Sequence, residues 1–259
     1  MLKRIVVGSA IAAAGWAAYT TTMRWYRTWG IDPAEAGKAL PGDELVTDPS
    51  ASDTRGLTIE APPEAVWPWL VQMGYGRGGW YSYDAIDMKG ASSGTILPEH
   101  QSLAVGDVVP TDPGGGFAVK VVEPEHALVL YIDPEVLAAR KAATVPVVDA
   151  TPGLAASGWF LETALPPQFT AAWAFVLEPL DGGQTRLLER FRVRLDGAST
   201  GSRFLGPLLD FGLFVMTQRQ MLGIRARAEK LARDREALPR DVDEVADQAM
   251  SAEPATSPA

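Results

Sequence analysis

The sequence predicts an α+β domain in which a curved antiparallel sheet of about six or seven strands wraps around one long C-terminal helix. Two observations predict this class. From Gly106 onward apolar residues alternate with polar ones between turn residues, which is the pattern of successive antiparallel strands. From about Ser202 to Arg235 the pattern becomes that of a long helix, apolar in its first half and cationic in its last turns. A run of strands closed by one helix favours a layered α+β fold.

Composition limits the classes of function. The chain has 259 residues, 47% of them hydrophobic and 21% charged, which is typical of a folded protein with one main domain. The net charge of −9 argues against nucleic acid as a partner, because phosphate contacts need clustered cations. The chain has no cysteine and only two histidines, His100 and His126, outside any metal-binding spacing. We therefore expect no metal and no cofactor.

The N-terminal segment has the pattern of a membrane anchor. Residues 5–23 carry no charge and lie between Lys3-Arg4 and Arg24. Nineteen helical residues reach roughly 28 Å, close to the ~30 Å hydrocarbon core of a bilayer. We expect residues 1–29 to form a single-pass anchor, with the side of the membrane undecided. A cleaved signal peptide, which would release a secreted protein, and a helix packed on the domain are the alternatives.

The next segments lead into the sheet. Residues 30–54 are rich in Pro, Gly and Asp and read as a linker that lets the domain stand off from the anchor. A short strand is expected at Gly56–Glu60. Pro62-Pro63 then opens a helix that Pro68 limits to a few turns. The folded domain is expected over 55–236 and a disordered acidic tail over 237–259.

The clearest hairpin joins Phe169–Leu177 to Arg186–Leu195 through the turn Asp181-Gly182-Gly183. In its second strand Leu187 and Phe191 face one way and the arginines at 190, 192 and 194 face the other. A short helix at 135–142 and a strand at 159–163 are expected before the hairpin.

Several motifs together resemble a known superfamily. They are the segment Ile59–Gly74, the following Gly-Arg-Gly-Gly-Trp-Tyr-Ser-Tyr-Asp at 76–84, Leu97-Pro98-Glu99, Val105-Gly106-Asp107 and the closing helix. This combination resembles an actinobacterial, membrane-anchored branch of the START-like (SRPBCC, polyketide cyclase/dehydrase-like) superfamily over roughly residues 55–235. The resemblance implies a helix-grip fold with an internal cavity. It implies no catalytic residue, and fold alone does not choose between lipid-transfer domains, receptors and cyclases.

Two glycine-rich motifs do not support enzymatic assignments. Gly74–Gly79 follows a helix and lacks phosphate-loop spacing, so we interpret it as a tight turn. Gly90–Gly94 matches G-x-S-x-G with Ser92 as nucleophile, followed by Asp107 and His126, but a nucleophile elbow needs a strand before it and a parallel sheet around it.

Glu189 is the most informative candidate for a site residue, because it shares a strand face with Leu187 and Phe191. A carboxylate on an apolar face is costly unless it is paired or reaches a polar cavity. It is either a ligand-orienting or general-base group with a raised pKa, or one half of an ion pair. The candidate catalytic residues are Glu189, Tyr83, Asp84 and His100. The candidate ligand-binding residues are Arg77, Trp80, Tyr83, Trp159, Trp173, Phe175 and Glu189.

Three functions follow. The leading one is membrane-tethered binding of an apolar small molecule, such as a lipid, an isoprenoid or a polyketide-like compound, in an internal cavity. The second is a cyclase, dehydratase or hydrolase that uses the cavity glutamate as general acid or base. The third is a structural protein of the cell envelope without a ligand. Ligand identity and oligomeric state stay open.

Overall fold

A computed structural model describes residues 2–87, 90–112, 115–132, 168–197 and 200–237. Its strands form one antiparallel sheet of six strands in the order β1-β6-β5-β4-β3-β2. The strands are β1 (Ala51–Ile59), β2 (Val108–Asp112), β3 (Gly115–Glu123), β4 (Ala127–Ile132), β5 (Gln168–Leu180) and β6 (Gln184–Asp196). From β2 to β6 each strand pairs with the next one in the sequence. Strand β1 instead pairs with the last strand, β6. This arrangement confirms the predicted curved antiparallel sheet.

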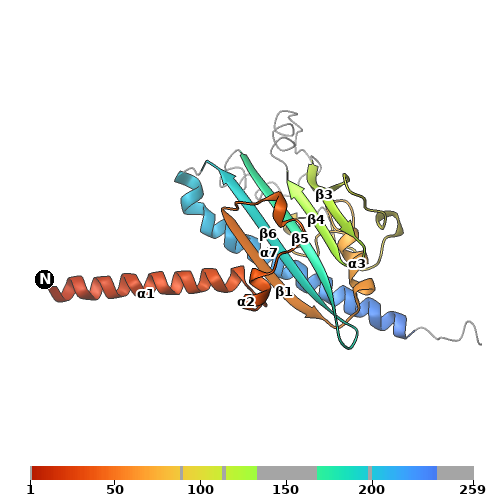
Figure 1. Cartoon of the computed structure of the whole chain (residues 1–259), viewed down its shortest axis with the longest axis horizontal. Coiled ribbons are helices and arrows are strands. Elements are labelled where there is room, and N and C mark those ends of the chain that lie inside the picture. Colours follow the sequence, from red (N-terminus) through yellow and green to blue (C-terminus); the bar gives the residue numbers. More distant parts are fainter. Residues whose placement is uncertain (1, 88–89, 113–114, 133–167, 198–199, 238–259) are drawn as a thin grey trace, which may run out of the picture.

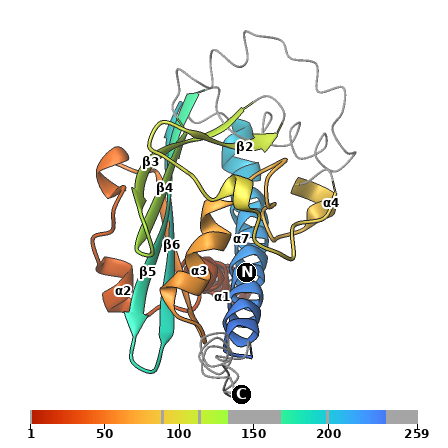
Figure 2. The ribbon, with the colours of Figure 1, turned by 90° about the vertical axis from the view of Figure 1, so that its right-hand side faces the viewer.

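The helices lie mainly on one side of the sheet (Figures 1 and 2). They are α1 (Leu2–Arg27), α2 (Pro33–Gly37), α3 (Pro63–Val71), α4 (Asp84–Asp87) and α7 (Thr200–Glu236), with short 3-10 turns η1 (Asp43–Leu45) and η2 (Pro98–His100). Figure 2 shows α3 and α7 on one side of the sheet and α2 on the other. The long α7 confirms the predicted closing helix, and we call the side that faces it the inner face.

Alternation of side chains explains why the inner face holds the core. In β5 and β6 the odd-numbered residues Phe175, Leu177 and Leu187 are buried together with Leu70 of α3 and Met221 of α7. Successive residues of a strand point to opposite faces, so one apolar set is enough to bind the sheet to the helices. The hairpin of β5 and β6 is longer than predicted, because pairing continues up to the turn at 181–183.

The outer face is covered by the segment that the sequence suggested would be a linker. Residues 30–50 do not stand off from the sheet but pack on it. Leu40 is buried against Val176 and Leu188, and Val46 is also buried. Arg190, on the outward side of β6, donates to the carbonyl oxygens of this segment. Strand β1 accordingly begins at Ala51, five residues earlier than expected.

Helix α1 projects from the domain (Figure 1). Among the residues that the structure describes, no helix is long and apolar enough to cross a membrane. The helix expected at 135–142, the strand at 159–163 and nearly all of the expected tail lie outside the described residues.

Candidate functional site

A buried ion pair lies on the inner face, between the edge strand β1 and its neighbour β6. Arg55 on β1 and Glu189 on β6 are register partners, and their side chains are completely withdrawn from solvent. Arg55 Nη1 and Glu189 Oε2 are 3.7 Å apart. Both residues point inward because they alternate with the buried Leu57 and Leu187 along their strands. Glu189 therefore lies on the face of its strand that the sequence predicted. Its partner is Arg55, which the sequence analysis placed directly after the predicted linker.

The rest of the Arg55 guanidinium is held from three sides. Nη2 donates to Asp53 Oδ2 at 2.8 Å and Nε donates to the Tyr26 carbonyl oxygen at 3.1 Å. The guanidinium carbon lies 5.7 Å from the centre of the Phe214 ring of α7, which is a cation–π distance. Arg55 thus connects the end of α1, the edge strand β1 and the closing helix.

Glu189 is satisfied on one oxygen only. Its Oε1 accepts a hydrogen bond of 2.7 Å from the indole nitrogen of Trp173. Its Oε2 and Arg55 Nη1 both lack a hydrogen-bond partner although they face each other. Burial raises the pKa of the Glu189 carboxyl, and Arg55 and the Trp173 hydrogen bond oppose that rise. Such unsatisfied buried polar atoms are rare in proteins and call for an explanation.

A second pair of charges extends this group to α1. Arg27 is ion-paired with Asp210 of α7, and its Nε lies 3.6 Å from Asp53 Oδ1. Burial raises the pKa of Asp53 to about 6, even though Arg55 and Arg27 favour the ionised form. We call Arg27, Asp53, Arg55, Glu189 and Asp210 the acid–arginine cluster.

Aromatic rings surround the Glu189 end of this cluster. Trp80 stacks on Trp173 with ring centres 5.6 Å apart, and Phe117, Phe175 and Phe191 each lie within 6.1 Å of the Trp173 ring. Trp80, Phe117 and Trp173 keep 6 to 8% of their surface exposed, whereas Phe175 keeps none. All of these rings except the half-buried Phe191 are buried, and Trp80, Phe117 and Trp173 are slightly less so than Phe175. We call Trp80, Phe117 and Trp173 the aromatic surface.

The backbone at Tyr81 places Trp80 on the sheet. Tyr81 has a positive φ of 59°, a conformation that non-glycine residues rarely adopt. Its hydroxyl donates to the Trp69 carbonyl oxygen, and Arg227 of α7 lies over its ring. These contacts hold Tyr81 against α3 and α7 while Trp80 reaches Trp173.

The other predicted residues lie in different surroundings. Arg77 donates to the carbonyl oxygens of Val71, Met73 and His100, so it caps the end of α3. Tyr83 is exposed, and Asp84 accepts hydrogen bonds from Ser92. None of the contacts described for Tyr83, Asp84 or His100 reaches Glu189. Trp159 lies outside the described residues.

The sequence analysis missed Asp53 and Arg55. Charged residues next to a Pro- and Gly-rich stretch looked like a linker. The signal that could have found them is the alternation Asp53, Arg55, Leu57, Ile59, which continues the inner face of β1 beyond its predicted start.

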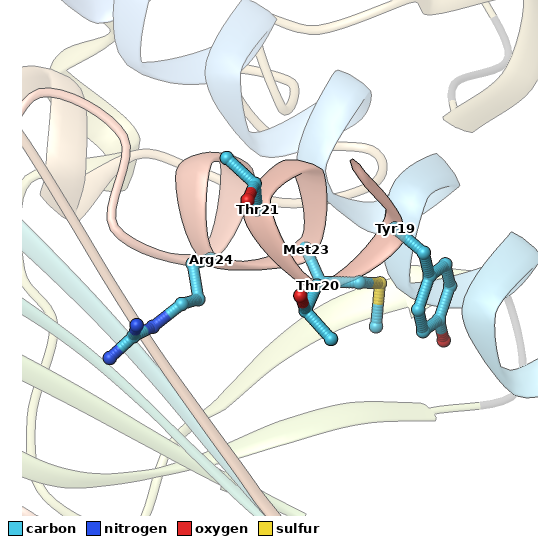
Figure 3. Close-up of a pocket in the computed structure, with 5 residues that line it drawn as sticks. All are labelled: Tyr19, Thr20, Thr21, Met23 and Arg24. Carbon is cyan, nitrogen blue, oxygen red and sulfur yellow. The ribbon is translucent and has the colours of Figure 1, made fainter. Parts of the chain in front are cut away.

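An open hollow of about 460 Å³ lies on α1, lined by Tyr19, Thr20, Thr21, Met23 and Arg24 (Figure 3). It is separate from the aromatic surface. Within the described ranges, no three His, Asp or Glu side chains are grouped so that they could hold a metal ion.

Fold and site define an α+β domain whose antiparallel sheet holds an acid–arginine cluster and an aromatic surface against a long closing helix. This arrangement fits a helix-grip fold. No family model matches the chain, and no curated protein matches it.

Solved structures show distant likenesses. Protein MLL2253 from Mesorhizobium loti is 16% identical over 70% of this chain and 98% of its own, with a TM-score of 0.34. Protein CV1439 from Chromobacterium violaceum is 14% identical over 69% and 96%, with a TM-score of 0.35. The di-domain ARO/CYC BexL of the BE-7585A biosynthetic pathway is 19% identical over 76% of this chain and 54% of its own, with a TM-score of 0.32. At these values the likenesses do not establish a family.

Proposed function

We propose that the protein binds a small apolar molecule against the aromatic surface, with Arg55 and Glu189 holding a polar group of that molecule. One observation carries the proposal: Oε2 of Glu189 and Nη1 of Arg55 face each other on an apolar face without hydrogen bonds. The two atoms attract each other as an ion pair, but at 3.7 Å neither makes a close hydrogen bond. A buried polar atom without one costs about 1–3 kcal/mol of desolvation. Binding sites for small molecules combine apolar walls with a few placed polar groups of this kind.

The two atoms limit which polar group fits. Oε2 of an ionised carboxylate accepts a hydrogen bond and Nη1 of a guanidinium donates one. A hydroxyl group can donate to the first and accept from the second. A ligand carboxylate would instead be repelled by Glu189 and Asp53, and a ligand cation by Arg55. We therefore propose a neutral, hydroxyl-bearing molecule with an apolar or aromatic body.

The polar atoms of Arg55 and Glu189 have no contact with solvent, so a ligand can reach them only if side chains move, and we propose that Trp80 moves off Trp173. Trp80 is stacked on Trp173, and the Trp173 indole is itself bonded to Glu189. A bound molecule would change the surroundings of both indoles. Tryptophan fluorescence therefore reports on this site directly.

The test uses the full-length chain with naphthol, farnesol and oleic acid as probes. The proposal expects the two alcohols to raise the melting temperature and to change tryptophan fluorescence, since a ligand of the native state stabilises it. Glu189→Gln should weaken both effects. Leu180→Ala, at the exposed end of β5, is the matched control and should leave both effects unchanged. No response of the wild-type chain to any of the three probes would contradict the proposal.

A second candidate is general acid–base catalysis by Glu189, and one observation favours it. Burial raises the pKa of this carboxyl, which is how enzymes prepare a glutamic acid for proton transfer near neutral pH. The nearby titratable groups are then Arg55 and Asp53 rather than Tyr83, Asp84 or His100. Incubation of each bound probe with the wild type and with Glu189→Gln, followed by mass spectrometry, tests it. Conversion by both proteins at equal rates would exclude this role.

A further inference from the structure

Large apolar side chains are exposed where α1 leaves the domain. On α1, Trp16 is 68% exposed and Trp25 is 55% exposed. On the adjoining part of α7, Leu208 is 57% exposed and Phe211 is 45% exposed. Tyr19 is exposed as well and lies 5.7 Å, ring centre to ring centre, from Trp16. We call Trp16, Tyr19, Trp25, Leu208 and Phe211 the α1–α7 apolar surface.

Ring contacts join the two helices beneath this surface. Trp25 packs edge-on against Phe214 with ring centres 5.4 Å apart, and Tyr26 contacts both Phe211 and Phe214. The ion pair between Arg27 and Asp210 lies in the same junction. The direction of α1 relative to α7 is therefore set by the contacts of Tyr26 and Phe214, both of which are buried. The exposed Trp25 and Phe211 border this junction, and Trp16 and Tyr19 lie further out on α1.

The charge of this end of the molecule is opposite to that of the whole chain. The first 31 residues contain Lys3, Arg4, Arg24 and Arg27 and no acid, whereas the whole chain carries −9. Arg24 also lines the hollow on α1 together with Tyr19 (Figure 3). Within α1, cations thus stand on both sides of the uncharged stretch 5–23, which includes the exposed rings of Trp16 and Tyr19.

We propose that the α1–α7 apolar surface docks the protein on an anionic lipid bilayer. Tryptophan and tyrosine prefer the membrane–water interface, and basic residues beside an apolar segment are attracted to anionic headgroups. Several large apolar side chains exposed on two packed helices are the kind of feature that marks an interaction site. A second copy of the chain suits it less well, because a symmetric contact would bring Lys3, Arg4 and Arg24 of both copies together, and the acid of the junction, Asp210, is already paired with Arg27.

This inference is independent of the small-molecule site and goes beyond a tether made by α1 alone. It assigns part of the contact to Leu208 and Phe211, which belong to α7. The junction also contains Arg27 and Asp210, which belong to the acid–arginine cluster. The docked surface therefore orients the whole domain relative to the lipid.

The experiment is sedimentation of the full-length chain with vesicles of phosphatidylcholine alone or mixed with phosphatidylglycerol. We expect binding to the mixed vesicles. We also expect the double variant Leu208→Ala/Phe211→Ala to lower the affinity at least about fivefold, because each buried CH₂ group contributes to such binding. Arg24→Glu should remove most of the preference for phosphatidylglycerol. Val105→Ala, an exposed apolar residue elsewhere, is the control and should not change binding.

Three results would overturn the proposal. The first is no binding of the wild type to either vesicle. The second is equal binding of the wild type and the Leu208→Ala/Phe211→Ala variant, which would leave α1 alone as the contact. The third is a dimer in sedimentation velocity that the same double variant dissociates, which would show that a second copy covers this surface.

Discussion

Arg55 and Glu189 stand directly opposite each other on β1 and β6, with 3.7 Å between Nη1 and Oε2 and no solvent contact on either side chain. A pair in this place loses the hydration of two ions, and their attraction offsets that loss only when the other polar atoms are satisfied. Asp53, the Tyr26 carbonyl and the Trp173 indole satisfy most of them. Removing one partner of the pair should therefore lower the free energy of unfolding more than replacing both partners with uncharged side chains.

Arg55→Met should lower the free energy of unfolding by about 3–5 kcal/mol, because it leaves Glu189 as an uncompensated buried charge. Combining it with Glu189→Gln should recover a large part of that loss. Urea unfolding of the wild type, both single variants and the double variant gives the coupling energy. Strictly additive effects would mean that the two side chains do not interact.

The matched control is an exposed ion pair. Lys38 and Glu178 form a pair in which Lys38 is about half exposed. Lys38→Met should change the free energy of unfolding by less than about 1 kcal/mol, because solvent screens such pairs.

Stability should also depend on pH through Asp53, whose pKa burial raises from 3.8 to about 6. Between these two values the folded protein binds more protons than the unfolded chain. The Asp53 contribution to stability is therefore full below pH ~4 and is lost as the pH rises through about 6. The stability difference between the wild type and Asp53→Asn should fall by up to about 3 kcal/mol across that window. Unfolding curves at closely spaced pH values measure it, and a constant difference would contradict the shifted pKa.

The sequence predicted the architecture because the signals for it are local. The alternation of apolar and polar residues in Arg186–Leu195 predicts a strand, and the helical pattern from about Ser202 to Arg235 predicts a long helix. The structure has both elements. The same alternation placed Glu189 on the inner face. The turn at 181–183 could be located because glycine adopts positive φ there without strain.

The partners of Glu189 could not be predicted in the same way. Asp53 and Arg55 are charged residues in a strand, where charge ordinarily indicates solvent. They become tolerable inside the fold because they pair with each other and because Glu189 and Arg27 compensate them from distant parts of the sequence. Such compensation depends on strand pairing between β1 and β6, which no local pattern reveals.

The packing of residues 30–50 on the outer face depends on Arg190. Its guanidinium donates to Thr54, to Asp43 and to the carbonyl oxygens of Ala36 and Lys38. Arg190→Met should therefore release this segment. Hydrogen exchange should become faster at the amides of Asp43 and Lys38, which are bonded within the segment.

A variant of the same strand serves as the control. Arg194 pairs with Asp196 at the surface, where both side chains are more than 40% exposed. Arg194→Met should leave exchange in 30–50 unchanged. Equal exchange rates in Arg190→Met and Arg194→Met would show that the buried guanidinium does not hold the segment.

The approach of α7 to Tyr81 gives the last prediction, which concerns two glycines of one helix. A Cβ at Gly223 would lie 2.3 Å from the Tyr81 carbonyl oxygen, whereas a Cβ at Gly212 would meet nothing within 4 Å. Alanine favours helix by about 1 kcal/mol over glycine, so Gly212→Ala should be neutral or stabilising. Gly223→Ala should instead lower the free energy of unfolding by at least about 2 kcal/mol, because the backbone of α7 or of Tyr81 must shift to make room for the methyl group. Tyr81 also places Trp80 on Trp173. Gly223→Ala should therefore weaken the near-UV circular dichroism of these two stacked indoles. Equal effects of the two substitutions would mean that α7 does not pack closely on Tyr81.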